Sequence, residues 1–257
     1  MIPKIIHYCW FGKGPMSPLH RRCVQSWQAA CPDYEFRLWD ESNSDIDNDY
    51  CRAAVAQRKW AFVSDFVRFD VLHKYGGIYL DTDLELIRPL DPLLDGTRCV
   101  MARESRDFVA TAFIACLPGD PVMAAARSTI LNRLVKSKTF VSSPLIVSAA
   151  LAALPPALCE VLEPASFYPF NPYDTDKPDN ARQLMYSDIT PDTFGIHHYG
   201  LKAGWKNGAF KTRLHKLLRR LKFKPDWDVC SDLASVRDPA PAPGAARPPV
   251  LSTGREP

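Results

Sequence analysis

Apolar residues occur along this chain in short runs that alternate with longer stretches of helical periodicity. Residues 2–11 form an apolar run that predicts a buried first strand, and residues 34–39 alternate apolar and polar positions with the period of a strand. Between them, residues 16–30 carry apolar side chains at helical spacing. The pattern therefore begins as strand, helix, strand.

The same alternation continues through the first half of the chain. Residues 41–49 are rich in Asp, Asn and Ser and predict a loop, after which a long helix is expected from residue 53 to residue 75, ended by Gly76-Gly77. We predict further strands over residues 78–80, 100–102 and 108–117, and helices over residues 121–136 and 144–154. Strands that alternate with helices predict an α/β fold with a largely parallel sheet, which binds ligands at the carboxyl ends of its strands.

Two carboxylates stand where one of these strands leaves the core. Asp81 and Asp83 follow the apolar run 78–80 with one residue between them. Neighbouring acidic groups repel each other, and either one is costly to bury without a partner. A divalent cation removes both costs, and oxygen ligands suit Mg²⁺ or Mn²⁺. The alternative is a solvated turn, because isolated Asp-x-Asp sequences are common.

Composition and charge narrow the class of protein. The chain has 257 residues, 46% of them hydrophobic, which suffices for one sizeable core, and no apolar stretch reaches the length of a membrane-spanning helix. The eight cysteines include no Cys-x-x-Cys pair, and the N-terminus lacks a secretory pattern, so we expect reduced thiols. Residues 206–224 hold eight Lys or Arg and no acidic residue, which indicates a local anionic partner rather than a nucleic acid.

Further candidate binding residues lie on both sides of the two carboxylates. Asp65 and Arg68 share one face of a mostly apolar predicted helix, where a charged pair should have a further partner such as a sugar hydroxyl; the alternative is an intrahelical salt bridge. Tyr8 and Trp10 close the first strand, where an aromatic ring can stack on a nucleobase or simply pack in the core.

The downstream candidates are histidines and a tryptophan. His197 and His198 precede Trp205, and imidazole is a reasonable third ligand for manganese beside two carboxylates. The indole N–H of Trp205 is able to donate to a phosphate oxygen. The sequence alone does not show that residue 197 lies near residue 81 in the fold, and it does not show whether His197 or His198 would bind the metal.

The chain resembles the DXD-containing sugar transferases of glycosyltransferase family 32. The resemblance rests on six pieces of sequence between residues 2 and 205, in which a glycine pair that leads into Asp-x-Asp and an upstream Ser-Asp-x-x-Arg form the specific combination. These pieces are Ile2–Trp10, Ser64–Arg68, Gly76–Asp83, Pro144 after two serines, Phe167–Pro169, and His197-His198 with Trp205. In the similar motif of family 8, a lysine stands at the position of Ala203, and Gly204 replaces a serine that is frequent in family 32.

The resemblance implies a GT-A (Rossmann-like) fold, with a mixed, largely parallel central sheet flanked by helices, and a nucleotide-diphosphate sugar as donor. It assigns Asp81, Asp83 and His197 to a Mn²⁺ or Mg²⁺ ion at the diphosphate, and Asp65 with Arg68 to the donor sugar. Tyr8, Trp10, Tyr79 and Trp205 complete the expected substrate-binding residues, with Trp10 against the base. Related families retain the anomeric configuration, so the resemblance implies retention.

We therefore predict a metal-dependent hexosyltransferase that uses a UDP-sugar and a glycan or lipid-linked acceptor in surface polysaccharide synthesis. The alternatives are a non-catalytic sugar-nucleotide- or glycan-binding protein and a secreted host-modifying glucosyltransferase. We expect a transferase domain over residues 1–208, a basic amphipathic segment over 209–237 and a disordered Pro/Ala-rich tail over 238–257. The basic helix over 209–224 either contacts an anionic membrane or packs on the domain, and we expect a cytoplasmic protein, peripheral at the inner face of the membrane in the first case.

Overall fold

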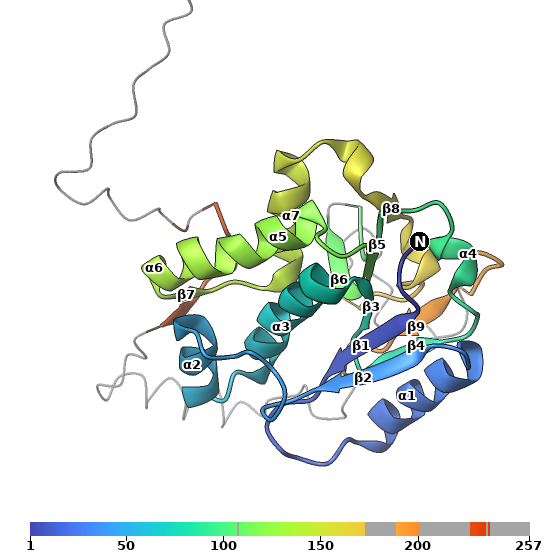
Figure 1. Cartoon of the computed structure of the whole chain (residues 1–257), viewed down its shortest axis with the longest axis horizontal. Helices are drawn as coiled ribbons and strands as arrows, with labels where there is room; N and C mark the ends of the chain where they lie inside the picture. Colours follow the sequence, from blue (N-terminus) through green and yellow to red (C-terminus); the bar gives the residue numbers. More distant parts are fainter. Residues whose placement is uncertain (107, 173–188, 201–226, 235, 237–257) are drawn as a thin grey trace, which may run out of the picture.

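A six-stranded sheet forms the centre of the molecule (Figure 1). The computed structural model describes residues 1–106, 108–172, 189–200, 227–234 and 236. The strand order is β2-β1-β3-β6-β5-β8. Their bounds are β1 (Ile5–Cys9), β2 (Glu35–Trp39), β3 (Gly77–Leu80), β5 (Cys99–Arg103), β6 (Val109–Cys116) and β8 (Glu160–Leu162).

Strand β6 gives the sheet its mixed character. It runs antiparallel to both of its neighbours, β3 and β5, whereas the pairs β1–β2, β1–β3 and β5–β8 are parallel. All strands other than β6 therefore point the same way, and their carboxyl ends share one edge. The expected α/β fold, with a mixed, largely parallel central sheet flanked by helices, is confirmed.

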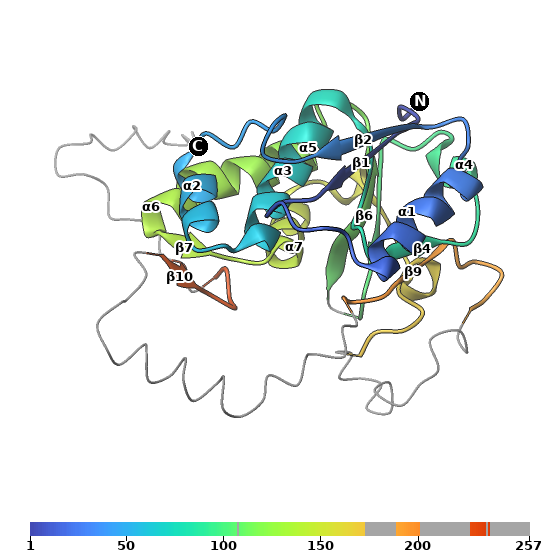
Figure 2. The same cartoon turned by 90° about the horizontal axis from the view of Figure 1, so that it is seen from below.

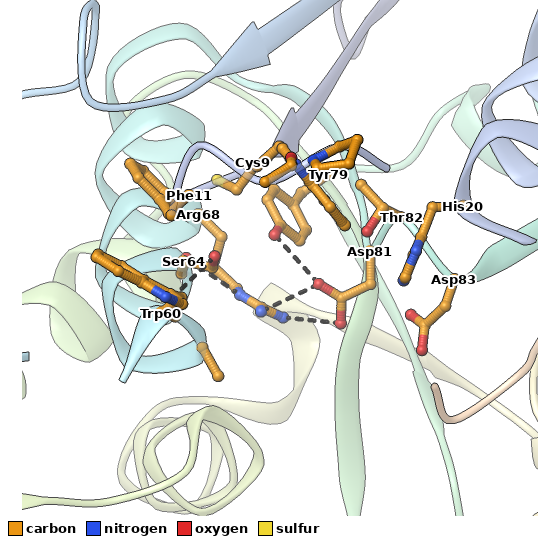
Figure 3. Close-up of a pocket in the computed structure, with 15 residues that line it drawn as sticks. Cys9, Phe11, His20, Trp60, Ser64, Arg68, Tyr79, Asp81, Thr82 and Asp83 are labelled. Atoms are coloured by element: carbon orange, nitrogen blue, oxygen red, sulfur yellow. Dashed lines mark hydrogen bonds and ion pairs between the residues drawn. The ribbon is translucent and has the colours of Figure 1, made fainter. Parts of the chain in front are cut away.

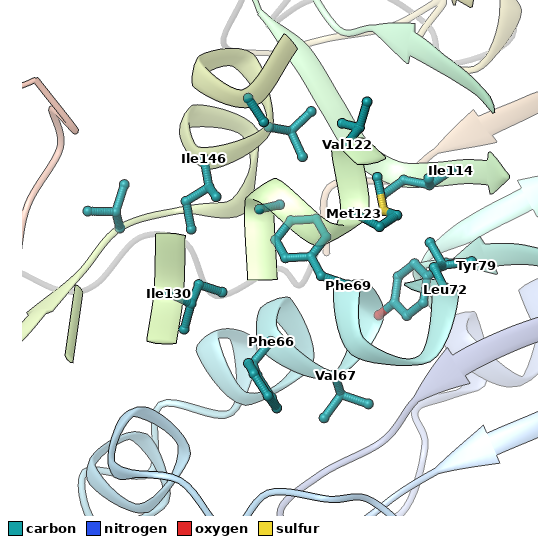
Figure 4. Close-up of a cluster of buried hydrophobic side chains, with 14 of the residues drawn as sticks. Phe66, Val67, Phe69, Leu72, Tyr79, Ile114, Val122, Met123, Ile130 and Ile146 are labelled. Carbon is teal, nitrogen blue, oxygen red and sulfur yellow. The ribbon is translucent and has the colours of Figure 1, made fainter. Parts of the chain in front are cut away.

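Helices cover both faces of the sheet (Figures 1 and 2). On one face, α1 (Pro18–Ala30) buries Cys23 and Trp27 in a core that includes Ile6 and Ile78. On the other face lie α3 (Trp60–Tyr75), α5 (Pro121–Ser128) and α7 (Ser143–Ala153), whose apolar side chains meet around Phe69 (Figure 4). Because strands alternate their side chains between the two faces, each face acquires its own apolar cluster.

Shorter helices and strands accompany these main elements. The remaining helices are α2 (Asp49–Ala56), α4 (Asp91–Leu94), the π-helix η1 (Thr129–Leu134), α6 (Val135–Ser137) and the 3₁₀ helices η2 (Pro156–Leu158) and η3 (Pro164–Ser166). Two small ribbons pair β4 (Leu84–Leu86) with β9 (Gly195–His197), and β7 (Thr139–Phe140) with β10 (Asp228–Val229). The sequence pattern predicted neither ribbon, because their strands have only two or three residues each.

The prediction of one long helix from residue 53 to residue 75 is wrong. Helix α2 ends at Ala56 and α3 begins at Trp60. Arg58 between them has φ +54°, in the left-handed region that terminates a helix, and the Lys59 N–H donates to the Ala54 carbonyl. The apolar pattern hides this break because both helices bury residues in the same cluster.

The expected stop at Gly76-Gly77 is confirmed, and it sets where β3 begins. Gly76 has φ +62° and Gly77 has φ +93°. A Cβ atom on Gly76 would lie 2.6 Å from Pro118, and one on Gly77 would lie 2.7 Å from the Ile5 carbonyl oxygen. Only glycine fits this turn, which delivers the chain from α3 into the centre of the sheet.

Several expectations for the end of the chain lie outside the described residues. These are Trp205, the basic helix over 209–224 and the tail over 238–257. Of the last part of the chain, Trp227, Leu233 and Val236 are buried in the cluster of α3, α5 and α7. All eight cysteines are free thiols, as predicted. Within the described residues, no helix combines the length and the apolar character needed to cross a bilayer.

A buried histidine fixes the junction between α3 and β3. His7 is fully buried; its Nε2 atom donates to the Gly76 carbonyl oxygen at 2.9 Å, and its Nδ1 atom accepts from the Trp39 indole N–H at 3.1 Å. Burial lowers the pKa of His7 from 6.5 to about 4, although the bond to Gly76 acts in the opposite direction. The imidazole is therefore neutral when it holds this turn.

His7 should make the folded protein less stable as the pH falls through the range between about 6.5 and about 4. The unfolded chain binds the proton below its ordinary pKa of 6.5 and the folded chain only below about 4, so the folded state loses stability as pH falls through this window. We expect a loss of about 2–3 kcal/mol between about pH 7 and pH 4.5. Urea unfolding of the wild type and His7→Gln at both pH values measures it, and equal losses in the two proteins would contradict the prediction.

Candidate functional site

The carboxyl ends of β1 and β3 form one wall of a large pocket (Figure 3). The Asp81 N–H donates to the Ala112 carbonyl oxygen at 2.9 Å, so Asp81 extends the pairing of β3 with β6 to the edge of the sheet. Beyond it, the Leu84 N–H donates to the Asp81 carbonyl oxygen in a tight turn. The pocket has a volume of about 680 Å³ and is lined by residues of the β1 and β3 ends and of the first turns of α1 and α3.

Arg68 and Tyr79 hold the Asp81 carboxylate from behind. The Arg68 guanidinium lies 3.1 Å from Asp81 Oδ1, and the Tyr79 hydroxyl donates to the same oxygen at 3.1 Å. The guanidinium also lies over the Tyr79 ring, 4.6 Å from its centroid. The orientation of Asp81 is therefore fixed by buried groups, which suits a carboxylate that must bind a ligand without rearranging.

The Arg68 side chain belongs to a buried polar network. A second contact of 3.0 Å joins its guanidinium to Asp65 Oδ1, and its NH1 group donates to the Thr111 carbonyl oxygen at 2.7 Å. Ser143, at the start of α7, donates to Asp65 through its hydroxyl at 2.6 Å and through its N–H at 3.3 Å. The alternative interpretation, an intrahelical ion pair between Asp65 and Arg68, is therefore present, and the further partners that the structure shows for it belong to the protein rather than to a sugar.

The network is costly to bury, and its charges depend on one another. Asp65 and Arg68 are 6% and 4% exposed. Burial raises the pKa of Asp65, against the opposing effects of the Arg68 charge and the Ser143 hydrogen bond. Burial would lower the pKa of Arg68, but the charges of Asp81 and Asp65 reverse that effect and raise it, so the guanidinium stays charged.

The β4–β9 ribbon carries His197 to the two carboxylates. Leu84 pairs with His197 in this ribbon, and the His198 N–H donates to the Asp83 carbonyl oxygen. The His197 Nε2 atom lies 3.3 Å from Asp83 Oδ1, and the Gly200 N–H donates to Asp83 Oδ2 at 2.6 Å. The Nε2 atom of His198 instead contacts Glu85 Oε2 at 2.9 Å. Of these two adjacent histidines, His197 therefore faces the Asp-x-Asp pair.

The donor atoms of this group suit a hard divalent cation. One ligand atom each from Asp81, Asp83 and His197 lies within 4.8 Å of the others. The buried Nδ1 atom of His197 has no hydrogen-bond partner among the described residues. Burial would raise the pKa of Asp83, but the neighbouring His197 and the Gly200 N–H lower it to about 2, so the carboxylate is ionised at neutral pH. Two carboxylate oxygens and one imidazole nitrogen fit Mn²⁺ or Mg²⁺.

Of the other predicted substrate-binding residues, Trp10 lines the pocket, whereas Tyr8 and Asp65 do not. Trp10 lines the pocket; its indole N–H donates to the Gly14 carbonyl oxygen at 2.5 Å, and its ring meets His20 edge-on with centroids 4.9 Å apart. Tyr8 points to the other face of the sheet and packs edge-on against Trp27. Asp65 lies behind Arg68 rather than in the pocket wall.

Several lining residues were not predicted, among them His20 and Trp60. His20 lies in the first turn of α1 and Trp60 begins α3. The Trp60 ring faces Gly12, where a Cβ atom would lie 2.8 Å from the indole nitrogen. Helices that follow parallel strands begin at the carboxyl edge of a sheet. Residues in the first turn of each predicted helix could therefore have been proposed as pocket-lining residues from the sequence.

Removal of the Arg68 charge should destabilise the fold strongly. In Arg68→Met, Asp65 and Asp81 lose their shared cation in a buried site, and we expect a loss of about 3–5 kcal/mol in the free energy of unfolding. Arg37→Met is the matched control, because Arg37 pairs with a Glu35 side chain that is 54% exposed, and such a pair contributes at most about 1 kcal/mol. Chemical denaturation measures both losses, and similar values would refute the buried network as a stabilising element.

Comparison with protein families identifies the region that holds these residues. Residues 17–100 match the family described as glycosyltransferase sugar-binding region containing DXD motif. The chain is 40% identical over 102 residues to inositol phosphoceramide mannosyltransferase 3 of Schizosaccharomyces pombe, a match that covers 36% of this chain and 27% of that protein. It is 33% identical over 102 residues to mannosyl phosphorylinositol ceramide synthase CSH1 of Saccharomyces cerevisiae, with 37% and 26% covered. The match thus spans about a quarter of each of these two relatives.

Solved structures with a similar fold include further glycosyltransferases. The PaToxG glycosyltransferase is 18% identical, with a TM-score of 0.47 over 59% of this chain and 68% of that chain. The galactosyltransferase LgtC is 15% identical, with a TM-score of 0.43 over 86% and 97%. Because these scores lie below 0.5, the assignment rests on the sequence match. The region that matches this DXD-containing glycosyltransferase family, residues 17–100, therefore holds Asp65, Arg68, Asp81 and Asp83, which belong to the pieces of sequence that carry the resemblance.

Proposed function

We propose that this protein transfers a sugar from a nucleotide-diphosphate sugar, with a UDP-sugar favoured, in a reaction that depends on Mn²⁺ or Mg²⁺. The observation that carries the proposal is the group of Asp81, Asp83 and His197 at one end of the 680 Å³ pocket. This volume lies within the range of about 300–1,000 Å³ that is usual for small-molecule sites.

The two ends of the pocket differ in chemistry, which supports one orientation of the donor. Phe11 and Trp60 line the side away from Asp83 (Figure 3), Trp10 lines the pocket beside His20, and flat rings of this kind bind nucleobases by stacking. The carboxylates at the other end repel a diphosphate unless a cation lies between them. The donor therefore binds with its base among the aromatic residues and its diphosphate beside Asp81 and Asp83.

Each residue of the site has a role in this proposal. A bound divalent cation would supply neutralisation of the charge that develops on the leaving diphosphate. Asp81, Asp83 and His197 hold that cation, and Arg68 with Tyr79 keeps Asp81 in its ligating orientation. Arg68 lines the pocket and contacts the donor sugar, and Asp65 supports it from behind. The resemblance to retaining families leads us to propose retention of the anomeric configuration.

The acceptor is proposed to be a glycan or a lipid-linked glycan. The first two relatives are named for mannosyl transfer to inositol phosphoceramide, which favours the lipid-linked form. Surface polysaccharide synthesis uses acceptors of this kind, and we propose that role. The basic segment over 209–224, from its sequence alone, is proposed to hold the enzyme at an anionic membrane surface.

Asp83→Asn should abolish metal-dependent turnover while the fold remains intact. The amide loses the negative charge that binds the cation, so we expect Mn²⁺ affinity and manganese-dependent hydrolysis of the nucleotide sugar to fall by at least about 100-fold. Calorimetric titration with Mn²⁺ and release of free nucleotide measure the two effects. Asp95→Asn, at an exposed position, is the control. Wild-type turnover in Asp83→Asn would refute the metal assignment, whereas nucleotide binding without hydrolysis in the wild type would favour a non-catalytic binding protein.

The preferred donor should stabilise the folded protein only when the cation is present. A ligand at 100 times its dissociation constant adds about 2.7 kcal/mol to the free energy of unfolding. We expect Mn²⁺ together with one nucleotide sugar to raise the melting temperature, with UDP-sugars above GDP-sugars. Thermal scans with each donor, with and without EDTA, measure the shift. An equal shift in EDTA would contradict the dependence on a cation.

A further inference from the structure

Glu104 lies at the same edge of the sheet as the Asp-x-Asp pair but on the other side from the nucleotide pocket. It directly follows β5, which runs parallel to β3 because both pair antiparallel with β6. The pocket is built on β1 and β3, whereas Glu104 lies two strands away from β3 in the opposite direction. Asp81 and His197 therefore lie between the nucleotide pocket and Glu104.

The backbone of Glu104 is held on both sides. Its N–H donates to the Phe108 carbonyl oxygen at 2.9 Å, which closes the turn between β5 and β6. Its carbonyl oxygen accepts from the side-chain amide of Asn171 at 2.8 Å, and Asn171 is 5% exposed. These bonds fix the point at which the Glu104 side chain leaves the backbone, and a site on an anchored backbone is more precise than one on a free loop.

The Glu104 carboxylate, by contrast with its backbone, has no polar partner among the described residues. In the part of the chain that the structure describes, no hydrogen bond or ion pair reaches its oxygens, although the residue is half-buried. Burial raises the pKa of this carboxyl, and the electrostatic effect of His197 opposes that shift, so the two side chains lie near each other. A partly desolvated carboxylate without a partner is destabilising, and a ligand that donates hydrogen bonds removes that cost.

We propose that Glu104 binds the acceptor through its ring hydroxyls. The inference rests on the proposed function, because it places the acceptor across Asp81 and His197 from the donor. An ionised carboxylate accepts hydrogen bonds at two oxygens, so it is suited to two adjacent hydroxyls of a sugar or of a cyclitol such as inositol. It repels a phosphate at the same place, so the charged groups of a lipid-linked acceptor lie away from Glu104.

Glu104→Gln tests this assignment, because the amide keeps the shape of the side chain and loses its charge. The assay offers the full-length protein with Mn²⁺ and the donor found by thermal stabilisation, and supplies methyl glucoside, methyl galactoside or myo-inositol as acceptor probes. We expect the KM for the probe to rise by about tenfold or more, since a hydrogen bond to a charged group is lost. Hydrolysis of the donor by water, and its binding affinity, should stay within about twofold of the wild type.

Glu163→Gln is the matched control, because Glu163 is an exposed glutamate next to β8, the neighbouring strand. It should leave all of these quantities unchanged, and equal melting temperatures verify that both variants fold. An unchanged KM in Glu104→Gln would overturn the inference, as would a wild type that hydrolyses the donor but transfers to none of the probes. Failure of the wild type to bind or hydrolyse any nucleotide sugar would instead overturn the proposed function. The ratio of inositol to glycoside transfer distinguishes the two sources of the hydroxyls.

Discussion

The Arg68 guanidinium, buried between two carboxylates, is the interaction on which the rest of the site depends. It lies 3.0 Å from Asp65 and 3.1 Å from Asp81, and it also binds the carbonyl oxygen of Thr111 on β6. Through Asp65 it is connected to Ser143 at the start of α7. The guanidinium thus joins α3, β6, α7 and the end of β3, and without it Asp65, which is 6% exposed, would be a buried charge with no cation beside it.

The sheet places the Arg68 guanidinium at the edge where the pocket lies. Because β1 and β3 are parallel, their carboxyl ends open on the same side, and the helices that pack beside them bring aromatic side chains to that side. The β4–β9 ribbon then returns a distant segment to the edge and adds His197 to the two carboxylates. The pocket lies on one side of the carboxylates, and Glu104, whose carboxylate has no polar partner among the described residues, lies on the other, as the proposed two-substrate site requires.

Many of the helices and strands could be predicted from local patterns. The elements that were missed either break at a single residue or are too short to show a pattern. The alternation at residues 34–39, the continuous apolar run at 108–117 and the helical spacing at 16–30 are strong local signals, and each element exists close to its expected bounds. The helix predicted over 53–75 is broken at Arg58, since a left-handed residue leaves no trace in an apolar pattern. The ribbon strands β4 and β9 are too short to show a period, and their pairing depends on contacts between distant segments.

The sequence by itself determined the alternation of strands and helices, the position of Asp81 and Asp83 at the end of a buried strand, and the need of Asp65 and Arg68 for partners. These properties follow from the order of neighbouring residues, which periodicity and charge reveal. Only the tertiary structure decided that His197 rather than His198 faces the carboxylates, and that Tyr8 packs against α1 while Trp10 lines the pocket. His197 and His198 are adjacent, and adjacent residues of an extended segment point to opposite sides, so the register of the β4–β9 ribbon decides which of them reaches the site. Trp10 lies beyond the end of β1 at Cys9, so its direction is set by the loop that follows the strand and not by the alternation that places Tyr8.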